Sequence, residues 1–274
     1  QKVENLRAAV LHADERSEIF VFVDSDVRAG EQWLRSLAAP LANDGVGAAT
    51  GYRWFVSDKT NFATELRSAW NASIASALGP NTRSNFCWGG STAIRRKVFE
   101  RLNIREKWLG TLSDDFAVTR AISEAGLPIH HVPRAIVPSA GGCSMFGLFE
   151  FTNRQMKITR VYARKLWLMS FFGSALFNAV MIASAAILIF SSAASLLWVA
   201  AILTLISITL LSIGKAWLRL RAIRMVVPSP AVDGQAAWQM TLWALTPAVF
   251  FVNCVAALFS TAIRWRGIEY RMIS

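Results

Sequence analysis

Two carboxylates stand two residues apart after a short apolar segment near the start of the sequence. Residues 18–26 read Glu18-Ile-Phe-Val-Phe-Val-Asp24-Ser25-Asp26. The β-branched and aromatic run predicts a buried parallel strand, and open α/β sheets bind ligands at the carboxyl ends of such strands. Two hard oxygen donors there can share one Mg²⁺ or Mn²⁺ whose other positions take a substrate diphosphate. In the alternative interpretation, Asp24 caps a helix that begins near Glu31.

A second acidic cluster, Ser113-Asp114-Asp115, opens a predicted helix. Ser113 is the expected N-cap, and the two aspartates lie in the first turn, where they would stabilise the helix dipole. The catalytic interpretation is a general base, because a carboxylate beside a bound hydroxyl can accept its proton. A neighbouring carboxylate raises the pKa of such a base toward the working pH.

The segment Cys87-Trp88-Gly89-Gly90-Ser91 combines an aromatic residue with two glycines. The glycines allow a ligand to approach the backbone closely, and Trp88 offers an apolar face to a sugar ring. A plain β-bulge is the alternative. His130 and His131 are interpreted as structural residues of a strand, and the spacing of the three cysteines indicates neither a zinc site nor a disulfide framework.

The elements that must position these residues alternate along the polar half of the chain. Hydrophobic periodicity predicts helices over 1–13, 61–78 and 114–125, and strands over 19–23, 45–54, 86–94 and 129–137. This rhythm predicts an α/β layer with a mostly parallel sheet.

The second half of the chain is apolar. No charged residue occurs between Lys165 and Lys215, and none from Gly234 to Ile263, a stretch that Pro247 interrupts. A membrane-spanning helix needs about 20 apolar residues, so membrane segments are expected over about 166–190, 193–214 and 237–262. Pro247 could make the third segment re-entrant, and the side on which it ends stays open at this stage.

The net charge of +11 comes almost entirely from this half. Residues 1–150 hold 17 Lys and Arg against 16 Asp and Glu, whereas residues 151–274 hold 12 against 2. The basic residues flank the apolar stretches, which is typical of the positive-inside distribution and not of a nucleic-acid footprint. We therefore expect a multi-pass protein of the inner or cell membrane, with residues 1–165 cytoplasmic. Residues 145–165 predict a basic amphipathic helix in the membrane interface.

Taken together, five segments resemble the inverting GT-A glycosyltransferases of family 2, and more closely the ceramide glucosyltransferase-like enzymes. They occur in the family's order and span essentially the whole chain. They are Asp24–Asp26 as the D-x-D, Trp88–Arg96 as G-x-S/T-x-A-x-R-R, Ser113–Asp115 as the acidic pair, Arg154–Lys157 as a variant of (Q/R)xxRW, and Trp265–Arg271 as a WRxGxYR-like tail.

The resemblance implies a fold and a set of site residues. A partial GT-A (Rossmann-like) nucleotide-sugar domain would occupy residues 1–144, the interfacial helix 145–165 and the membrane domain 166–274. Asp115 would be the catalytic base, and Asp24 and Asp26 would bind Mg²⁺ or Mn²⁺. The implied donor-sugar residues are Asp24, Trp88, Gly89, Gly90, Asp114, Arg154, Gln155, Lys157 and Arg160.

Two departures from the family pattern qualify the resemblance. Lys157-Ile158 stands where Arg-Trp is expected, so Arg160 is a second candidate for the motif's cation. Gln1–Leu6 resembles a segment that directly precedes the D-x-D strand, and the family carries a transmembrane helix and two strands upstream of it. The resemblance therefore implies an amino-terminally truncated glycosyltransferase, and an inactive fragment is one alternative.

The implied activity is transfer of a hexose from a UDP-sugar to a hydroxyl of a membrane lipid, with inversion at the anomeric carbon. The partners would be the sugar donor, the lipid acceptor and the membrane, and no nucleic acid. A processive polysaccharide synthase and a non-catalytic, membrane-anchored nucleotide-binding scaffold are the alternatives. The identities of the sugar, the lipid and the metal stay open.

Overall fold

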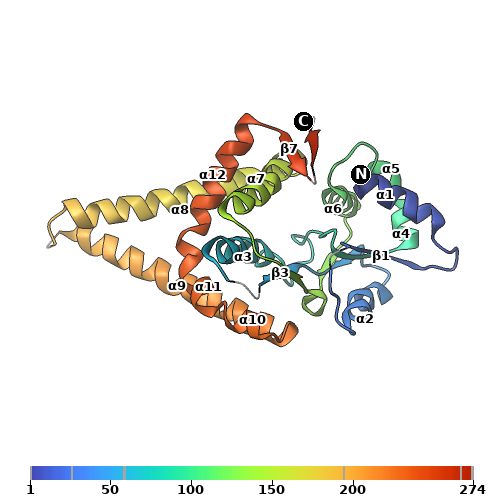
Figure 1. Ribbon diagram of the computed structural model, residues 1–274, viewed down its shortest axis with the longest axis horizontal. Coiled ribbons are helices and arrows are strands. Elements are labelled where there is room, and N and C mark those ends of the chain that lie inside the picture. Colours follow the sequence, from blue (N-terminus) through green and yellow to red (C-terminus); the bar gives the residue numbers. More distant parts are fainter. Residues whose placement is uncertain (1, 26, 58–59, 194, 266, 273–274) are drawn as a thin grey trace. The chain divides into compact units, whose positions relative to one another are not determined.

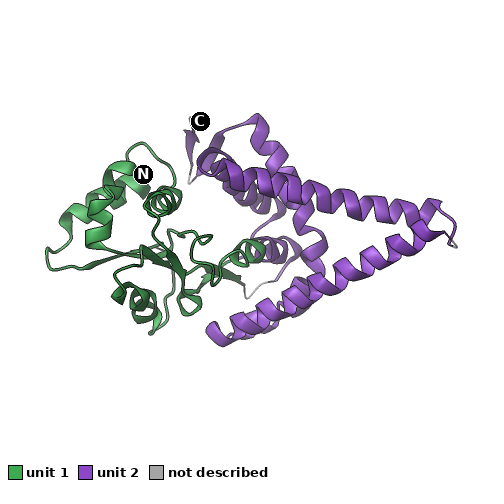
Figure 2. Ribbon diagram, turned by 180° about the vertical axis from the view of Figure 1, so that it is seen from behind, with its two compact units in different colours: residues 1–56, 71–141 green, residues 57–70, 142–274 purple. Residues whose placement is uncertain are grey.

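The computed structural model describes residues 2–25, 27–57, 60–193, 195–265 and 267–272. The chain divides into two compact units, residues 1–56 with 71–141 and residues 57–70 with 142–274 (Figures 1 and 2). Helix α3 (Phe62–Ala75) begins in the second unit and ends in the first. Strands and helices both occur, so the predicted mixed α/β class is confirmed.

A four-stranded sheet forms the centre of the first unit. Its order is β1 (Ile19–Val23), β4 (Ser91–Arg95), β2 (Ala48–Thr50) and β5 (Ile129–His131). Strand β4 runs antiparallel to both β1 and β2, and among the described strands of this sheet only β2 and β5 pair in parallel. The prediction of a mostly parallel sheet is therefore wrong.

The direction of β4 follows from where the chain enters it. A parallel neighbour needs a crossover that returns the chain to the edge where the first strand began. The chain instead enters β4 beside the end of β1, with Ser91 paired to Val23 and Arg95 to Ile19. Asp24 and the glycines before β4 are thereby brought to the same edge of the sheet.

A second pair of strands in this unit is parallel. It consists of β3 (Arg53–Val56) and β6 (Val137–Ala140). The single strand predicted over 45–54 is broken at Gly51, where an added Cβ would lie 1.9 Å from the carbonyl oxygen of Ala135. Only glycine allows this close backbone approach. The strand predicted over 129–137 is likewise interrupted, by the 3-10 helix η3 (Pro133–Ala135).

Helices and an aromatic cluster complete the first unit. The elements are α1 (Lys2–Ala9), η1 (Val10–His12), α2 (Trp33–Ala38), η2 (Ala39–Ala42), α4 (Arg96–Arg101), α5 (Ile104–Lys107) and α6 (Asp114–Glu124). The Phe22 ring centroid lies 5.3 Å from that of Trp108 and 6.0 Å from that of Phe99, which fixes β1 to the segments after β4. The helix predicted over 1–13 is confirmed as α1 and η1, although Leu11 is exposed.

The second unit is helical. Its helices are α7 (Met145–Tyr162), α8 (Arg164–Phe190), α9 (Leu196–Val226), α10 (Pro230–Asp233), α11 (Ala236–Thr241), η4 (Leu242–Ala244) and α12 (Thr246–Phe259). Helices α8 and α9 pack on each other and are long and apolar enough to cross a membrane. Helix α8 covers the span predicted over 166–190. Helix α9 begins three residues after the start of the span predicted over 193–214 and continues twelve residues further, because its basic end is still rich in good helix formers.

The third predicted segment, 237–262, is bent. Residues 230–244 and α12 meet at an angle of 59° and count as one further span only if taken as a single bent pair. Pro247 lies in the first turn of α12, where a proline starts a helix and its missing N–H costs no hydrogen bond.

Helix α7 confirms the helix predicted over 145–165, but its buried stripe faces protein. Leu148, Thr152 and Met156 are buried, and α7 packs against α12 and α8. Phe146, in the first turn, is 79% exposed. The hairpin β7 (Ala262–Trp265) and β8 (Ile268–Arg271) follows α12, and β7 contacts α7.

Buried polar side chains attach the start of α3 to the other helices of this unit. Gln235 and Gln239 each donate a hydrogen bond to the Ser68 hydroxyl at 3.2 Å, and Arg219 donates to the Gln239 amide oxygen at 2.8 Å. These bonds satisfy groups whose burial would otherwise be costly. They explain why residues 57–70 belong to the helical unit.

Candidate active site

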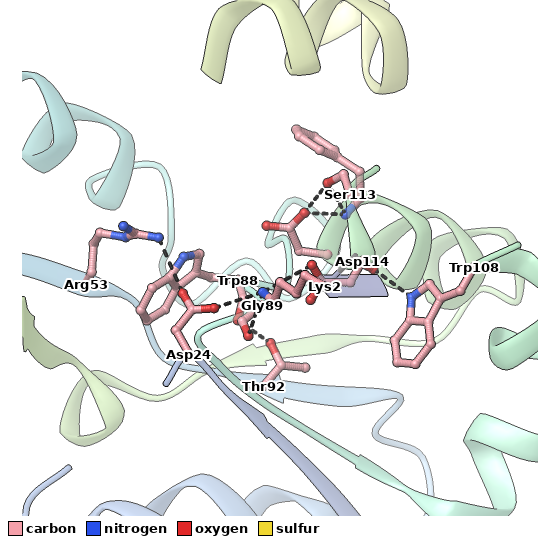
Figure 3. Close-up of polar contacts among 11 residues, drawn as sticks. Lys2, Asp24, Arg53, Trp88, Gly89, Thr92, Trp108, Ser113 and Asp114 are labelled. Atoms are coloured by element: carbon pink, nitrogen blue, oxygen red, sulfur yellow. Dashed lines mark hydrogen bonds and ion pairs between the residues drawn. The ribbon is translucent and has the colours of Figure 1, made fainter. Parts of the chain in front are cut away.

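The site in the first unit is built around a turn with two glycines. The amide of Ser91 donates to the Trp88 carbonyl at 2.9 Å, and the Thr92 hydroxyl donates to the same oxygen at 2.7 Å (Figure 3). A Cβ on Gly89 would lie 2.3 Å from Asp114 Oδ2, and one on Gly90 would lie 2.7 Å from Asp24 Oδ2. The absence of side chains here lets both carboxylates pack directly on the turn.

A lysine connects the two predicted acidic clusters. Lys2 Nζ lies 2.8 Å from Asp24 Oδ1 and 3.2 Å from Asp114 Oδ1, and it donates to the Gly89 carbonyl at 3.5 Å (Figure 3). Burial disfavours the charged form of Lys2, but the carboxylates of Asp114 and Asp24 outweigh it and raise its pKa. Residues 112 positions apart in the sequence thus share one partly buried charge network.

Arg53 supplies a second positive charge. Its Nη2 lies 3.7 Å from Asp24 Oδ2, and its guanidinium carbon lies 4.6 Å from the centre of the Trp88 ring. The centroid of the Trp88 ring lies 5.6 Å from that of the Tyr52 ring, and Trp88 is only 7% exposed. Arg53 therefore occupies one face of the ring that the sequence assigned to a sugar.

The amino end of α6 presents Asp114 and Asp115. The Ser113 hydroxyl caps the helix by accepting from the Phe116 amide at 3.4 Å, and Asp115 Oδ1 accepts from the same amide at 2.8 Å. Ser113 also donates a hydrogen bond to Asp115. The predicted N-cap is therefore confirmed, and the same segment carries the two carboxylates at the start of α6.

Burial, together with the neighbouring Asp115 carboxylate, raises the pKa of Asp114 from 3.8 to about 6. Because the folded state then binds a proton that the unfolded state releases, stability falls as pH rises between about 4 and 6. We expect wild type to lose thermal stability relative to Asp114→Asn across this window in metal-free detergent solution, and the difference to be constant above it. A difference that does not change with pH would contradict the assignment of this shift to Asp114.

The other predicted donor-site residues lie on α7, in the second unit. Lys157 Nζ donates to the carbonyl of Ala262 at 2.9 Å. Arg160 donates to the carbonyls of Ala257 and Leu258 at the carboxyl end of α12. The guanidinium carbon of Arg154 lies 5.4 Å from the centre of the Trp265 ring. Gln155 accepts a hydrogen bond from the Thr159 hydroxyl at its backbone carbonyl.

A family model matches this chain from end to end. The model is that of glycosyl transferase family 21, and it covers residues 1–274. The chain belongs to glycosyl transferase family 21. No curated protein matches it. The predicted resemblance to glycosyltransferases is confirmed at this level, so this family 21 glycosyltransferase uses a sugar donor and an acceptor.

The metal ion predicted from the sequence would need oxygen ligands around Asp24 in this glycosyltransferase. Among the residues that the structure describes, no group of three or more His, Cys, Asp or Glu side chains could hold a metal ion. Asp26, a predicted ligand, lies outside the described residues. Three oxygen atoms nevertheless surround the Lys2 ammonium: the carboxylates of Asp24 and Asp114 and the carbonyl of Gly89. Hard oxygens of this kind suit Mg²⁺ and Mn²⁺.

Two site residues of the family 21 glycosyltransferase were not found from sequence. Lys2 was recognised only as part of a segment resembling the family, and Arg53 was not singled out. The acidic clusters themselves indicated that such cations exist, because carboxylates removed from solvent need nearby positive charges. The sequence could not say which of its 29 Lys and Arg residues would serve.

The contacts of Arg160 predict a structural role in this glycosyltransferase. Replacing it by Met removes charge-assisted bonds to the end of α12, so we expect unfolding to become easier by about 1–3 kcal/mol. Thermal unfolding in detergent measures this, with Lys165→Met, an exposed site three residues beyond α7, as control. Unchanged stability together with weaker UDP binding would instead support the role predicted from the motif.

Proposed function

We propose that this protein transfers a hexose from a UDP-sugar to a hydroxyl of a membrane lipid, with inversion, as a ceramide glucosyltransferase-like enzyme. One observation carries the proposal: in a chain of a glycosyltransferase family, the carboxylates of Asp24 and Asp114 converge beside a glycine turn, and Asp115 follows directly. The two long apolar helices support a lipid acceptor, because they are suited to hold the enzyme at the bilayer.

Asp115 is proposed as the general base. It would accept the proton of the lipid hydroxyl while that oxygen attacks the anomeric carbon from the face opposite the departing UDP. The bond from this carbon to the diphosphate oxygen breaks in the same step, and inversion follows from the attack on the opposite face. The backbone amide of Phe116 fixes the carboxylate for this task.

Binding of the donor is proposed for the residues around Asp24. Mg²⁺ or Mn²⁺ bound by Asp24 with Asp26 would neutralise the negative charge of the diphosphate. Trp88, Gly89, Gly90 and Asp114 would line the donor site, the glycines by leaving backbone accessible. Among the α7 residues, we keep Arg154 and Gln155 as donor-site candidates and assign Lys157 and Arg160 to the backbone contacts described above.

The proposed setting is a GT-A nucleotide-sugar fold in the first unit, on the cytoplasmic side of a membrane crossed by α8 and α9. The basic residues around Lys165 and Lys215 support this orientation. Helix α7, which directly precedes α8, would lie at headgroup depth, so that a lipid acceptor need not leave the bilayer.

The decisive experiment incubates the full-length protein in lipid micelles with radiolabelled UDP-sugars, total membrane lipid and Mg²⁺ or Mn²⁺. Label in one discrete lipid in the organic phase is the expected result and names the donor. Label in insoluble polymer would replace the proposal by a processive polysaccharide synthase. Binding of UDP with no transfer to any acceptor would replace it by a nucleotide-binding scaffold.

A further inference from the structure

Lys2 occupies a position suited to a metal ion. We propose that its ammonium group is the resident cation of the site and that a divalent ion binds by displacing it, so that Lys2 sets the affinity for metal. The proposal rests on the metal dependence included in the proposed function. Lys2 would position the carboxylates of Asp24 and Asp114, and its ammonium would compete with the metal ion for them.

The geometry around Lys2 resembles a coordination shell. Three hard oxygens surround its Nζ: Asp24 Oδ1 at 2.8 Å, Asp114 Oδ1 at 3.2 Å and the Gly89 carbonyl at 3.5 Å. They come from three separate elements, namely the end of β1, the start of α6 and the turn before β4. Oxygens that converge in this way are the ligands that Mg²⁺ and Mn²⁺ prefer, at distances near 2.1 Å.

The ammonium and a divalent ion cannot share this position. A metal ion bound to the Asp24 carboxylate would lie next to Lys2 Nζ, which is 2.8 Å from Asp24 Oδ1, and two cations so close repel each other strongly where solvent screens them little. The ammonium must therefore withdraw when a metal ion binds.

The side chain is able to withdraw. Lysine carries its charge on a flexible four-carbon stem, and the Lys2 side chain is 26% exposed, so it already reaches solvent in part. Without metal, the ammonium offsets the repulsion between the buried Asp114 carboxylate and the partly exposed Asp24 carboxylate. Exchange of one cation for another thus preserves the compact site in both states.

The exchange can be tested in the unmodified full-length protein by acetylating lysines with a water-soluble reagent and reading each site by mass spectrometry. Addition of Mn²⁺ is expected to raise the labelling rate of Lys2 several-fold, because the amine is released from its ion pairs. Lys107, 44% exposed and paired with Glu124 at 3.4 Å, serves as internal control and should not change. Labelling of Lys2 that stays constant or falls as Mn²⁺ increases would overturn the proposal.

A second measurement compares Mn²⁺ binding by electron paramagnetic resonance in Lys2→Met, Lys107→Met and wild type, without UDP-sugar. Lys2→Met is expected to bind Mn²⁺ at least tenfold more tightly than wild type, and to regain with Mn²⁺ the thermal stability that it loses without metal. A variant that folds only when Mn²⁺ is present also supports the exchange. Equal or weaker affinity in Lys2→Met, or misfolding that Mn²⁺ does not rescue, would refute it.

Failure of this proposal and failure of the proposed function give different results. An enzyme that transfers sugar to lipid without binding Mn²⁺ at this site would refute the exchange and leave the proposed function standing. A protein in which Mn²⁺ displaces the Lys2 ammonium but which transfers no sugar would refute the proposed function and leave the exchange standing.

Discussion

Asp115→Asn is expected to reduce sugar transfer by the full-length protein by about 10²–10⁴-fold, the range that loss of a general base produces. Binding of UDP should change less than twofold, because the proposed role of Asp115 concerns the acceptor hydroxyl. The asparagine oxygen can still accept the Phe116 amide hydrogen, so the amino end of α6 should remain capped. Transfer rates and UDP binding by calorimetry measure the two effects separately.

Glu124→Gln is the matched control for this variant. It removes a carboxylate charge from the last residue of the same helix, where Glu124 pairs with Lys107. Its transfer rate should equal that of wild type. Undiminished transfer by Asp115→Asn would refute the assignment of the base, and an equal loss in both variants would show that only the net charge of α6 matters.

Gly89→Ala is expected to lower transfer by about 10²-fold or more, and stability by about 1–3 kcal/mol. The new Cβ would lie 2.3 Å from Asp114 Oδ2 and 3.0 Å from Lys2 Nζ, so the carboxylate and the ammonium must both move. A displacement of about 1 Å at a catalytic site is enough for a loss of this size. Transfer assays and thermal unfolding in detergent give the two quantities.

Gly79→Ala provides the comparison, since no heavy atom lies within 4 Å of an added Cβ at Gly79. It carries the same substitution in the same unit, and both quantities should stay close to wild type. If Gly89→Ala behaved like Gly79→Ala, the tight packing of the carboxylates on the turn would be irrelevant to activity.

Local patterns predicted the individual pieces of the site well. The apolar run before Asp24 ends as a strand at Val23, and Ser113 caps the helix that presents Asp114. Both depend on neighbouring residues alone. The direction of β4 could not be predicted in this way, because a strand has the same side-chain period in a parallel and an antiparallel pair.

Long-range contacts account for what the sequence did not predict. Lys2 lies 22 residues from Asp24 and 112 from Asp114, and nothing in its neighbourhood sets it apart from other lysines. The cations predicted for the donor site were chosen from a motif, and the carbonyls that Lys157 and Arg160 bind lie about 100 residues further along the chain. The bend before α12, in contrast, could be predicted, because Pro247 already indicated an interruption of the third apolar segment.

That bend decides how often the chain crosses the bilayer. Helices α8 and α9 form an antiparallel pair, so with both spanning, as proposed, α9 returns the chain to the side of α7. Lys157 of α7 binds the carbonyl of Ala262, directly after α12, so the chain is on that side again when the bent pair ends. In the proposed topology, the pair would therefore enter the bilayer and come back through the same leaflet. Arg264 and Arg271 would then share a side with the other basic residues, as the positive-inside rule for membrane proteins expects.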